Sequence, residues 1–390
     1  MSTLSYAHLL EASHPGGPSA LTERTSLRPA AGDQALVAPA KYASTRGNNG
    51  TYVYETRFDG KEPIRTVLID SRTSVANRLE AALVQAIEDG HSLLRRIPRI
   101  RVIYSTTDPR VIITDMELPH RAFDAHVRLG THDGRPVTDD PVYRDARNST
   151  PANAFNLLQL SPDTVIFGGW DSTRKAHQAR FASTTVGEVI GVLADQDHFQ
   201  PTRRSGARID PLAPSFALSK TDIASLAQSL GEDAGSKASK AKKASDFLVG
   251  AIPPGTDSLD GIATSSIEKS QVISFSTLRS LRFGKDAEGD AAVRALLAAI
   301  VLEALVRSDA ELVLRANTHL VEKARPELVL DRRFGEQEQL EPLTIEVVDS
   351  ILDEAFDRAE RDAGLNWNGQ IFEVEGNPIL PGAAVATEDD

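Results

Sequence analysis

The sequence of 390 residues predicts an α+β protein. Strand-like and helix-like segments alternate irregularly along it, long insertions separate them, and no internal repeat is visible. A regular doubly wound fold would alternate the two kinds of element at short, even spacing. With 41% hydrophobic residues, the chain can bury one large core or two modest ones. We therefore expect a sheet with helices on one face.

The first half shows one strong helix and several strands. Four apolar residues recur at helical spacing from Val75 to Ile87, and Gly90 ends the pattern. Short apolar runs between turn residues indicate strands. The expected strands are residues 22–27, 67–69, 99–104, 111–116 and 164–167, and a second, short helix is expected over residues 152–160. Residues 181–193 fit either a strand or a helix.

The second half is divided by a change in composition. Residues 231–262 are rich in Gly, Ala, Ser and Asp, which predicts a flexible loop. Its lysines are Lys237, Lys240, Lys242 and Lys243. The chain therefore divides into residues 1–230, this loop, residues 263–330 and an acidic, helical C-terminal extension over residues 331–390.

Beyond the loop, we expect strands at residues 274–283 and 312–316 and an apolar helix at residues 291–307. An amphipathic acidic helix is expected at residues 345–361. Its inward residues would be Val348, Ile351, Leu352 and Phe356.

Composition excludes several classes of protein. The chain has no cysteine, which excludes disulfides, iron–sulfur clusters and zinc sites with sulfur ligands and makes a reducing cytoplasm the simple expectation. The longest apolar run, residues 295–302, is too short to span a bilayer. No Lys or Arg precedes Arg24, so the N-terminus does not resemble a secretory signal. We expect no membrane partner.

The negative charge is unevenly distributed. Residues 286–390 hold 9 basic and 24 acidic side chains, whereas residues 1–285 hold 34 and 31. The net charge of −12 is thus a property of the C-terminal quarter, and arginines elsewhere are free to gather on one surface. Arginine outnumbers lysine 32 to 11, which fits bidentate phosphate contacts or, equally, a bias in base composition.

The common catalytic motifs are missing. The sequence contains no phosphate-binding loop, no dinucleotide fingerprint and no nucleophile elbow, so nucleotide hydrolysis and the common hydrolase folds lose support. The best metal candidate is an evenly spaced set that would share one face of an extended segment. It comprises His120, His126 and His132 with Asp124 and Asp133. The alternative is a set of solvated or hydrogen-bonded histidines.

Residues 65–80 and 164–174 each contain an apolar run that ends in Asp-Ser, and an arginine follows within two residues. Such strand ends suit the binding of a polyanion or catalysis at a sheet edge. Asp171 beside Ser172 fits a general base, although an Asx-type turn is the more common role of this pair. Asn77 and Arg78 lie just after a helix start, where backbone N–H groups favour an anion, or they form a surface ion pair.

Five motifs in order make the sequence similar to a known family. They are DSRTSVANRLE (70–80), His120-Arg121 with Asp124-Ala125, FGGWDS (167–172) with residues 179–181, RIDPL (208–212) and LRSLRF (278–283). Together they resemble the backbone subunit of the type I-G (formerly I-U) CRISPR Cascade complex. This is the Csb-one or Cas-seven family of the RAMP superfamily. The resemblance covers residues 65 to 305, about two thirds of the chain.

The resemblance implies a modified RNA-recognition (ferredoxin-like) palm with finger and thumb-like insertions. Residues 1–230 and 263–330 would form the palm. Several copies would polymerise along one CRISPR RNA in the cytoplasm and present it for pairing with target DNA, without cutting and without a cofactor. The other partners would be a capping and processing subunit, a large subunit and a recruited helicase-nuclease. A guide must keep its base edges free, so its holder should grip phosphate and ribose, which fits an aromatic content of only 5%.

Carried over by position, ten residues are expected to line the RNA path. They are Asn77, Arg78, Arg121, Arg128, Trp170, Asp171, Ser172, Arg180, Arg279 and Arg282. The four loop lysines would add nucleic-acid contacts. The first alternative is a metal-dependent nuclease of the same superfamily that uses Asp124 or Asp171, and the second is a protein-binding scaffold that uses the acidic helix.

Overall fold

The computed structural model describes residues 1–43, 51–107, 109–175, 178–198, 200–229, 243–314 and 318–381, and it confirms the α+β class. Its main sheet is antiparallel and has the order β16-β15-β1-β13-β10-β3-β2, with β14 also paired to β1. The strands are β1 (Ala20–Pro29), β2 (Tyr54–Asp59), β3 (Glu62–Asp70), β10 (Thr185–Leu193), β13 (Thr264–Ser274), β14 (Leu320–Glu322), β15 (Glu327–Asp331) and β16 (Gln337–Leu340). The predicted strands at residues 22–27 and 67–69 are confirmed.

Four strands of this sheet and two helices form one β-α-β-β-α-β unit. Along the chain the order is β1, α2 (Arg72–Glu88), β10, β13, α10 (Ala287–Ala310) and β15. In space the four strands lie in the order β15-β1-β13-β10, and each neighbouring pair is antiparallel. This β-α-β-β-α-β arrangement is that of a ferredoxin-like double split βαβ unit. The hairpin β2–β3 is inserted between β1 and α2 and extends the sheet beyond β10.

Helix α2 forms where the sequence predicts it. The Ser71 side chain accepts a hydrogen bond from the Ser74 backbone N–H at 3.4 Å and thereby caps the helix. Val75, Leu79 and Leu83 are buried, and Gly90 follows the helix with a φ of +97°. The apolar spacing therefore identified both the helix and its buried face.

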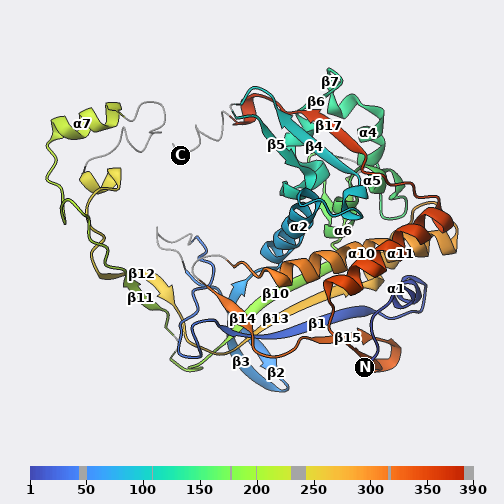
Figure 1. Cartoon of the computed structure of the whole chain (residues 1–390), viewed down its shortest axis with the longest axis horizontal. Coiled ribbons are helices and arrows are strands. Elements are labelled where there is room, and N and C mark those ends of the chain that lie inside the picture. Colours follow the sequence, from blue (N-terminus) through green and yellow to red (C-terminus); the bar gives the residue numbers. More distant parts are fainter. Residues whose placement is uncertain are drawn as a thin grey trace.

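Helices α10 and α11 (Ile345–Ala363) lie side by side over the main sheet (Figure 1). Helix α10 is buried on nearly all sides because α1 (Tyr6–Ser13), α2 and α11 surround it. All four residues predicted to face inward on α11 are buried. The acidic helix is thus part of the main core, and its charged residues occupy the solvent face.

A second sheet has the order β5-β4-β17-β6-β7. Its strands are β4 (Arg99–Tyr104), β5 (Val111–Thr114), β6 (Thr131–His132), β7 (Arg135–Pro136) and β17 (Ile371–Glu375). Strand β17 pairs in parallel with β4, and Val102 and Val374 at the centre of this pair are fully buried. The C-terminal extension is therefore more than helical, since it supplies β16 to one sheet and β17 to the other.

A long arm leaves the main sheet between β10 and β13. It contains the two-stranded ribbon β11 (Thr202–Ser205) and β12 (Gly255–Gly261) and the helix α7 (Lys220–Ser229). Leu259 of β12 is buried in a small core cluster with main-sheet residues such as Leu27 and Val189, whereas α7 lies apart from both sheets in Figure 1. Part of the predicted flexible loop is thus a strand, because Gly255–Gly261 pairs with β11, which lies about fifty residues earlier in the sequence. Lys237, Lys240 and Lys242 lie outside the described residues, and Lys243 precedes a short turn of 3-10 helix.

Two predicted strands are wrong, and local capping explains both. Residues 164–167 belong to helix α6 (Pro162–Phe167), which the Ser161 side chain caps through the Thr164 N–H at 3.4 Å. Residues 275–279 form helix α9 (Phe275–Arg279), which Ser274 caps in the same way. In both cases a serine N-cap outweighs the strand preference of the apolar residues that follow. Of the strand predicted at residues 312–316, residues 312–314 are in no strand, and residues 315 and 316 lie outside the described residues.

The remaining elements are short. They are the helices α3 (Ala125–Arg128), α4 (Pro141–Arg147) and α5 (Phe155–Leu160) and the strands β8 (Gly169–Trp170) and β9 (Arg180–Phe181). Helix α5 confirms the expected short helix, and residues 185–193 resolve the ambiguous segment as strand β10. Within the described ranges, none of the helices has the length and apolar character needed to cross a bilayer.

Candidate nucleic-acid groove

Three separate segments of the sequence enclose a hollow of about 760 Å³. The small ribbon β8–β9 forms one wall, and the turn before η3 (Arg121–Phe123) forms another. The lining residues are Pro119, His120, Arg121, Phe167, Gly168, Gly169, Trp170, Ser172, Arg180, Phe181, Ala182 and Ser183. We call this hollow the groove.

An exposed cation and an exposed aromatic ring are stacked at the mouth of the groove. Trp170 and Arg180 are directly opposite in the β8–β9 pair, and the Arg180 guanidinium carbon lies 4.3 Å from the Trp170 ring centroid. The Trp170 side chain is 52% exposed, and its Nε1–H donates to Gln178 Oε1 at 3.2 Å. The stack orients the arginine while its charge stays in solvent.

Two glycines let the chain turn tightly at the floor of the groove. Gly168 has a φ of +88°, and a Cβ there would lie 2.8 Å from the Phe181 carbonyl oxygen. A Cβ on Gly169 would lie 2.7 Å from Thr164 Cγ2. At Gly168 both the backbone conformation and the space require glycine, and at Gly169 the space does.

Asp171 has a structural role in the turn after β8. It is 1% exposed, and it accepts hydrogen bonds from Arg147 Nε at 2.6 Å and from the Thr173 N–H at 3.1 Å. Burial alone would raise the pKa of Asp171, but the bonds from Arg147 and Thr173 lower it below its ordinary value. Its carboxylate is thus the acceptor of an Asx-type turn, which agrees with the more common of the two sequence interpretations.

Three further expected residues lie on the groove or near it. Ser172 is exposed on the groove, and Asn77 is exposed on α2, one turn before Glu80, whose side chain contacts the groove residue Arg121. Arg128 is half-buried and donates to the Phe123 carbonyl at 2.7 Å.

The other arginines lie outside the groove lining and are engaged with protein groups. Arg78 forms an ion pair with the buried Asp70 carboxylate. Arg279 Nη1 donates to the Ala12 carbonyl at 2.5 Å and the Pro18 carbonyl at 2.7 Å. Arg282 is exposed and 3.5 Å from Asp290. The structure thus brings together Arg121, Trp170, Ser172 and Arg180 from the ten expected residues.

His120, the glycine pair and Ser183 on the groove, and three arginines on the arm, were not among the ten residues expected on the RNA path. Arg203, Arg204 and Arg208 lie on or beside strand β11, and Arg204 pairs with Asp260 at 2.6 Å. The run TRRSGAR over residues 202–208 was the available signal, because it holds three cations in seven residues.

A comparison with known families bears directly on this groove. Residues 21–196 match the family model described as CRISPR-associated protein GSU0053. This supports a CRISPR-associated protein with a role in CRISPR defence. Every residue that lines the groove lies inside this CRISPR-associated segment. No curated protein matches the chain.

The predicted histidine metal set does not converge. The segment is not extended, because residues 121–128 form η3 and α3 and residues 131–136 form a hairpin. Asp124 caps α3 through the His126 N–H, and the His126 ring bonds to Tyr104. His132 Nδ1 contacts the Glu373 carbonyl at 2.6 Å. These side chains are therefore hydrogen-bonded within the fold, as in the alternative interpretation.

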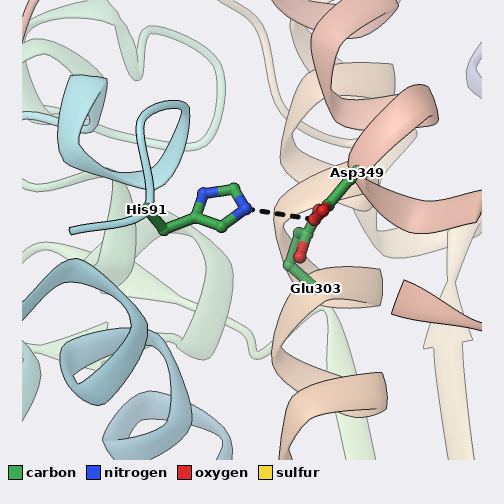
Figure 2. A group of neighbouring side chains, drawn as sticks. All are labelled: His91, Glu303 and Asp349. Carbon is green, nitrogen blue, oxygen red and sulfur yellow. Dashed lines mark hydrogen bonds and ion pairs between the residues drawn. The ribbon is translucent and has the colours of Figure 1, made fainter. Parts of the chain in front are cut away.

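Another group of possible ligands lies between α10, α11 and the turn after α2. His91, Glu303 and Asp349 have ligand atoms within 4.8 Å of one another. Figure 2 shows the His91 ring pointing toward the two carboxylates. His91 Nδ1 accepts from the Leu94 N–H at 3.2 Å, so the proton is on Nε2, which faces Asp349 Oδ1 at 3.1 Å. A metal on Nε2 would require this proton to move to Nδ1, against the Leu94 N–H.

Arg307 already supplies the positive charge of this junction. Its Nε lies 2.9 Å from Glu303 Oε2, and its Nη2 lies 2.7 Å from Asp349 Oδ1. A divalent ion would be repelled by this guanidinium. We therefore interpret His91, Glu303, Asp349 and Arg307 as a hydrogen-bonded junction that joins two helices of the main core.

The junction makes stability depend on pH. Burial, and less strongly the nearby Asp349 carboxylate, raises the pKa of Glu303 from its ordinary value of 4.5 to about 8, against the opposing effect of the Arg307 guanidinium. The folded protein therefore holds a proton that the unfolded chain has lost, and this contribution to stability declines as the pH rises from 4.5 through about 8. Glu303→Gln should reduce the loss of Tm between pH 6 and pH 9 by about 2 °C or more. Thermal unfolding of this variant and of the exposed-site control Glu354→Gln measures the effect, and equal pH profiles for wild type and Glu303→Gln would contradict it.

Proposed function

We propose that this protein is a non-catalytic, CRISPR RNA-binding backbone subunit of a type I effector complex, of the type I-G (Cascade) class. Several copies polymerise along one guide, and the assembly presents the guide for pairing with target DNA. The observation that carries this proposal is the exposed Arg180, stacked on Trp170 at the mouth of a groove that lies within the CRISPR-associated segment.

The fold is consistent with an RNA-recognition palm. The β-α-β-β-α-β unit is the arrangement on which RNA-recognition modules are built. In this reading, the arm between β10 and β13 is the thumb-like insertion, and Arg203, Arg204 and Arg208 are its contacts to nucleic acid, together with the loop lysines. The exposed acidic face of α11 is turned to solvent or to a basic surface of another subunit.

The groove suits the backbone of a nucleic acid better than its bases. Trp170 is the groove's exposed aromatic residue with a cation over its face, so its ring supports the arginine more than it offers an open stacking surface. Phosphate and ribose are bound by guanidinium groups, hydroxyls and backbone N–H groups. The groove offers the Arg180 guanidinium, the Ser172 hydroxyl and the backbone of a tight glycine turn. The guide's base edges would remain free for pairing.

The partners follow from this role. They are CRISPR RNA, target DNA through the guide, further copies of the same chain, the capping and processing subunit and the large subunit. The complete complex would recruit a helicase-nuclease. The expected location is the cytoplasm.

The two carboxylates that the nuclease alternative would use, Asp124 and Asp171, are buried and engaged within the fold. Asp124 is 5% exposed and caps α3, and Asp171 is 1% exposed and paired with Arg147. Neither carboxylate faces the groove, so we propose that the protein does not hydrolyse nucleic acid. Incubation with labelled RNA and DNA and with Mg²⁺ or Mn²⁺ is the direct check.

The main test is whether the protein binds RNA cooperatively and without sequence preference. Purification from cells that express a guide should yield protein with a nucleic-acid-like ratio of absorbance at 260 to 280 nm. The purified chain should then bind two unrelated RNAs of equal length with the same affinity and with positive cooperativity, because identical neighbours contact each other along the strand. A clean protein spectrum combined with no RNA binding would favour the scaffold alternative, and strong preference for one RNA would rule out backbone recognition.

A further inference from the structure

Arg121 differs from Arg180, the other arginine of the groove lining, because its guanidinium bonds to groups inside the protein. Its Nε and Nη2 lie 2.5 Å and 2.8 Å from the two carboxylate oxygens of Glu80, and its Nη1 donates to the Gly168 carbonyl at 3.0 Å. Asp163 Oδ2 is 3.3 Å from the Nε. The side chain is only 14% exposed, and three of its five N–H groups are engaged by Glu80 and Gly168.

The backbone at Arg121 is held in an unusual conformation. Its φ is +48°, a region that residues other than glycine seldom occupy and that costs free energy. The conformation directs the side chain inward, and backbone hydrogen bonds from Arg121 to Leu118 and from Asp124 to Arg121, each of 3.0 Å, fix it on both sides. These backbone hydrogen bonds thus stabilise an unfavourable conformation that places the guanidinium beside the groove.

The region beneath the groove carries an excess of buried acid. Glu80, Asp115 and Asp163 are each no more than 4% exposed, and Arg121 is the cation that bonds to two of them. Burial raises the pKa of Asp115 to about 7, and burial and Glu80 raise the pKa of Asp163. Without the Arg121 guanidinium the Glu80 carboxylate would be a buried charge with no partner.

Arg121 is linked to the exposed residues Trp170 and Arg180 through the Gly168 turn and strand β8. The Gly168 carbonyl held by Arg121 directly precedes β8, and β8 carries Trp170, which pairs with Arg180 across the ribbon. Helix α2 anchors the other end of the connection, because Glu80 is on its buried face. A rigid helix, a buried ion pair and a glycine turn therefore lead from the core to the residues that face solvent.

We propose that Arg121 is a positioning residue, which fixes the Gly168 turn to Glu80 and thereby holds Trp170 and Arg180 in the geometry that binds nucleic acid. This role differs from direct RNA contact by Arg121, which was the expectation from the sequence and stays a prediction. The inference rests on the proposed function for its consequence in binding, but not for its structural part.

The variant Arg121→Lys separates these two parts. Lysine keeps the charge but cannot make the two parallel bonds to Glu80 together with the bond to Gly168. The chain has two tryptophans, and Trp367 is 1% exposed, so acrylamide quenching of tryptophan fluorescence reports chiefly on Trp170. We expect stronger quenching in Arg121→Lys without RNA and no change in the matched control Arg101→Lys, whose partner Glu373 is on the second sheet.

RNA binding supplies the second readout. Affinity of Arg121→Lys should fall about tenfold. In Arg121→Gln, which removes the charge, the dependence of log affinity on log salt should keep its slope, because no phosphate contact is removed. A slope flatter by about 0.7 would show that Arg121 contacts a phosphate itself and would overturn the proposal. Unchanged quenching in a folded Arg121→Lys protein would overturn it as well.

A second variant covers the case in which Arg121→Lys does not fold. Glu80→Gln keeps the shape of the partner and one acceptor oxygen while it removes the charge, and it should increase quenching in the same direction. If the wild type binds no RNA, the proposed function fails, whereas the quenching experiment still decides whether Arg121 positions the Trp170 turn.

Discussion

Charge reversal at Arg180 should weaken RNA binding by about tenfold or more at low salt, for all RNA sequences alike. Arg180 is exposed beside Trp170 at the groove and has no carboxylate partner among the described residues. A phosphate contact to single-stranded RNA releases counterions, so its loss should also flatten the slope of log affinity against log salt by about 0.7. Filter binding or fluorescence anisotropy over a range of salt concentrations measures both quantities.

The matched control for Arg180→Glu is Arg325→Glu. Arg325 lies between β14 and β15, its side chain is 71% exposed, and it is not among the residues of the groove. This variant should bind RNA with nearly the wild-type affinity and slope. Equal losses in both variants would mean that the net charge of the protein, and not the groove, governs binding.

Removal of the Asp171 carboxylate should destabilise the protein by about 3 kcal/mol and leave the response to divalent ions unchanged. In Asp171→Ala, Arg147 loses its 2.6 Å partner inside the fold, and the turn after β8 loses the acceptor of the Thr173 N–H. Denaturant unfolding gives the change in the free energy of unfolding, and Tm with and without Mn²⁺ tests for an ion site.

A double-mutant cycle sharpens the Asp171 experiment. Arg147→Ala should be destabilising by a similar amount, and the double variant should lose less than the sum of the two, because the pair is already broken in each single variant. A fully stable Asp171→Ala protein that loses an RNA-cleaving activity of the wild type would instead favour the nuclease alternative.

The sequence predicted the elements whose apolar residues repeat over several turns or along a whole strand. Helices α2, α10 and α11 and strands β1, β3 and β4 are confirmed for this reason. It failed at α6 and α9, where a serine before the apolar run caps a helix of about one or two turns. It could not show the β12 strand, because its partner β11 is distant in sequence.

The candidate site was predictable only in part, because a sequence shows a cation but not its partner. Arg180 and Trp170, both expected on the RNA path, lie opposite each other on one small ribbon, a pairing that their separate motifs did not show. Arg78 and Arg279 are engaged by Asp70 and by two N-terminal carbonyl groups. Whether these last two also contact RNA stays a prediction.

The parallel pair β4–β17 has a consequence for synthesis of the chain. Arg101 on β4 meets Glu373 on β17 across 272 residues of sequence, and β17 lies between β4 and β6 in the second sheet. At elongation rates of about 5–20 residues per second, the β4 edge waits roughly 15–55 s on the ribosome before its neighbour exists. During that time β4 can pair with β5 but its other edge stays unpaired, so the second sheet closes only after translation is nearly complete. A prematurely terminated chain leaves that edge open to aggregation.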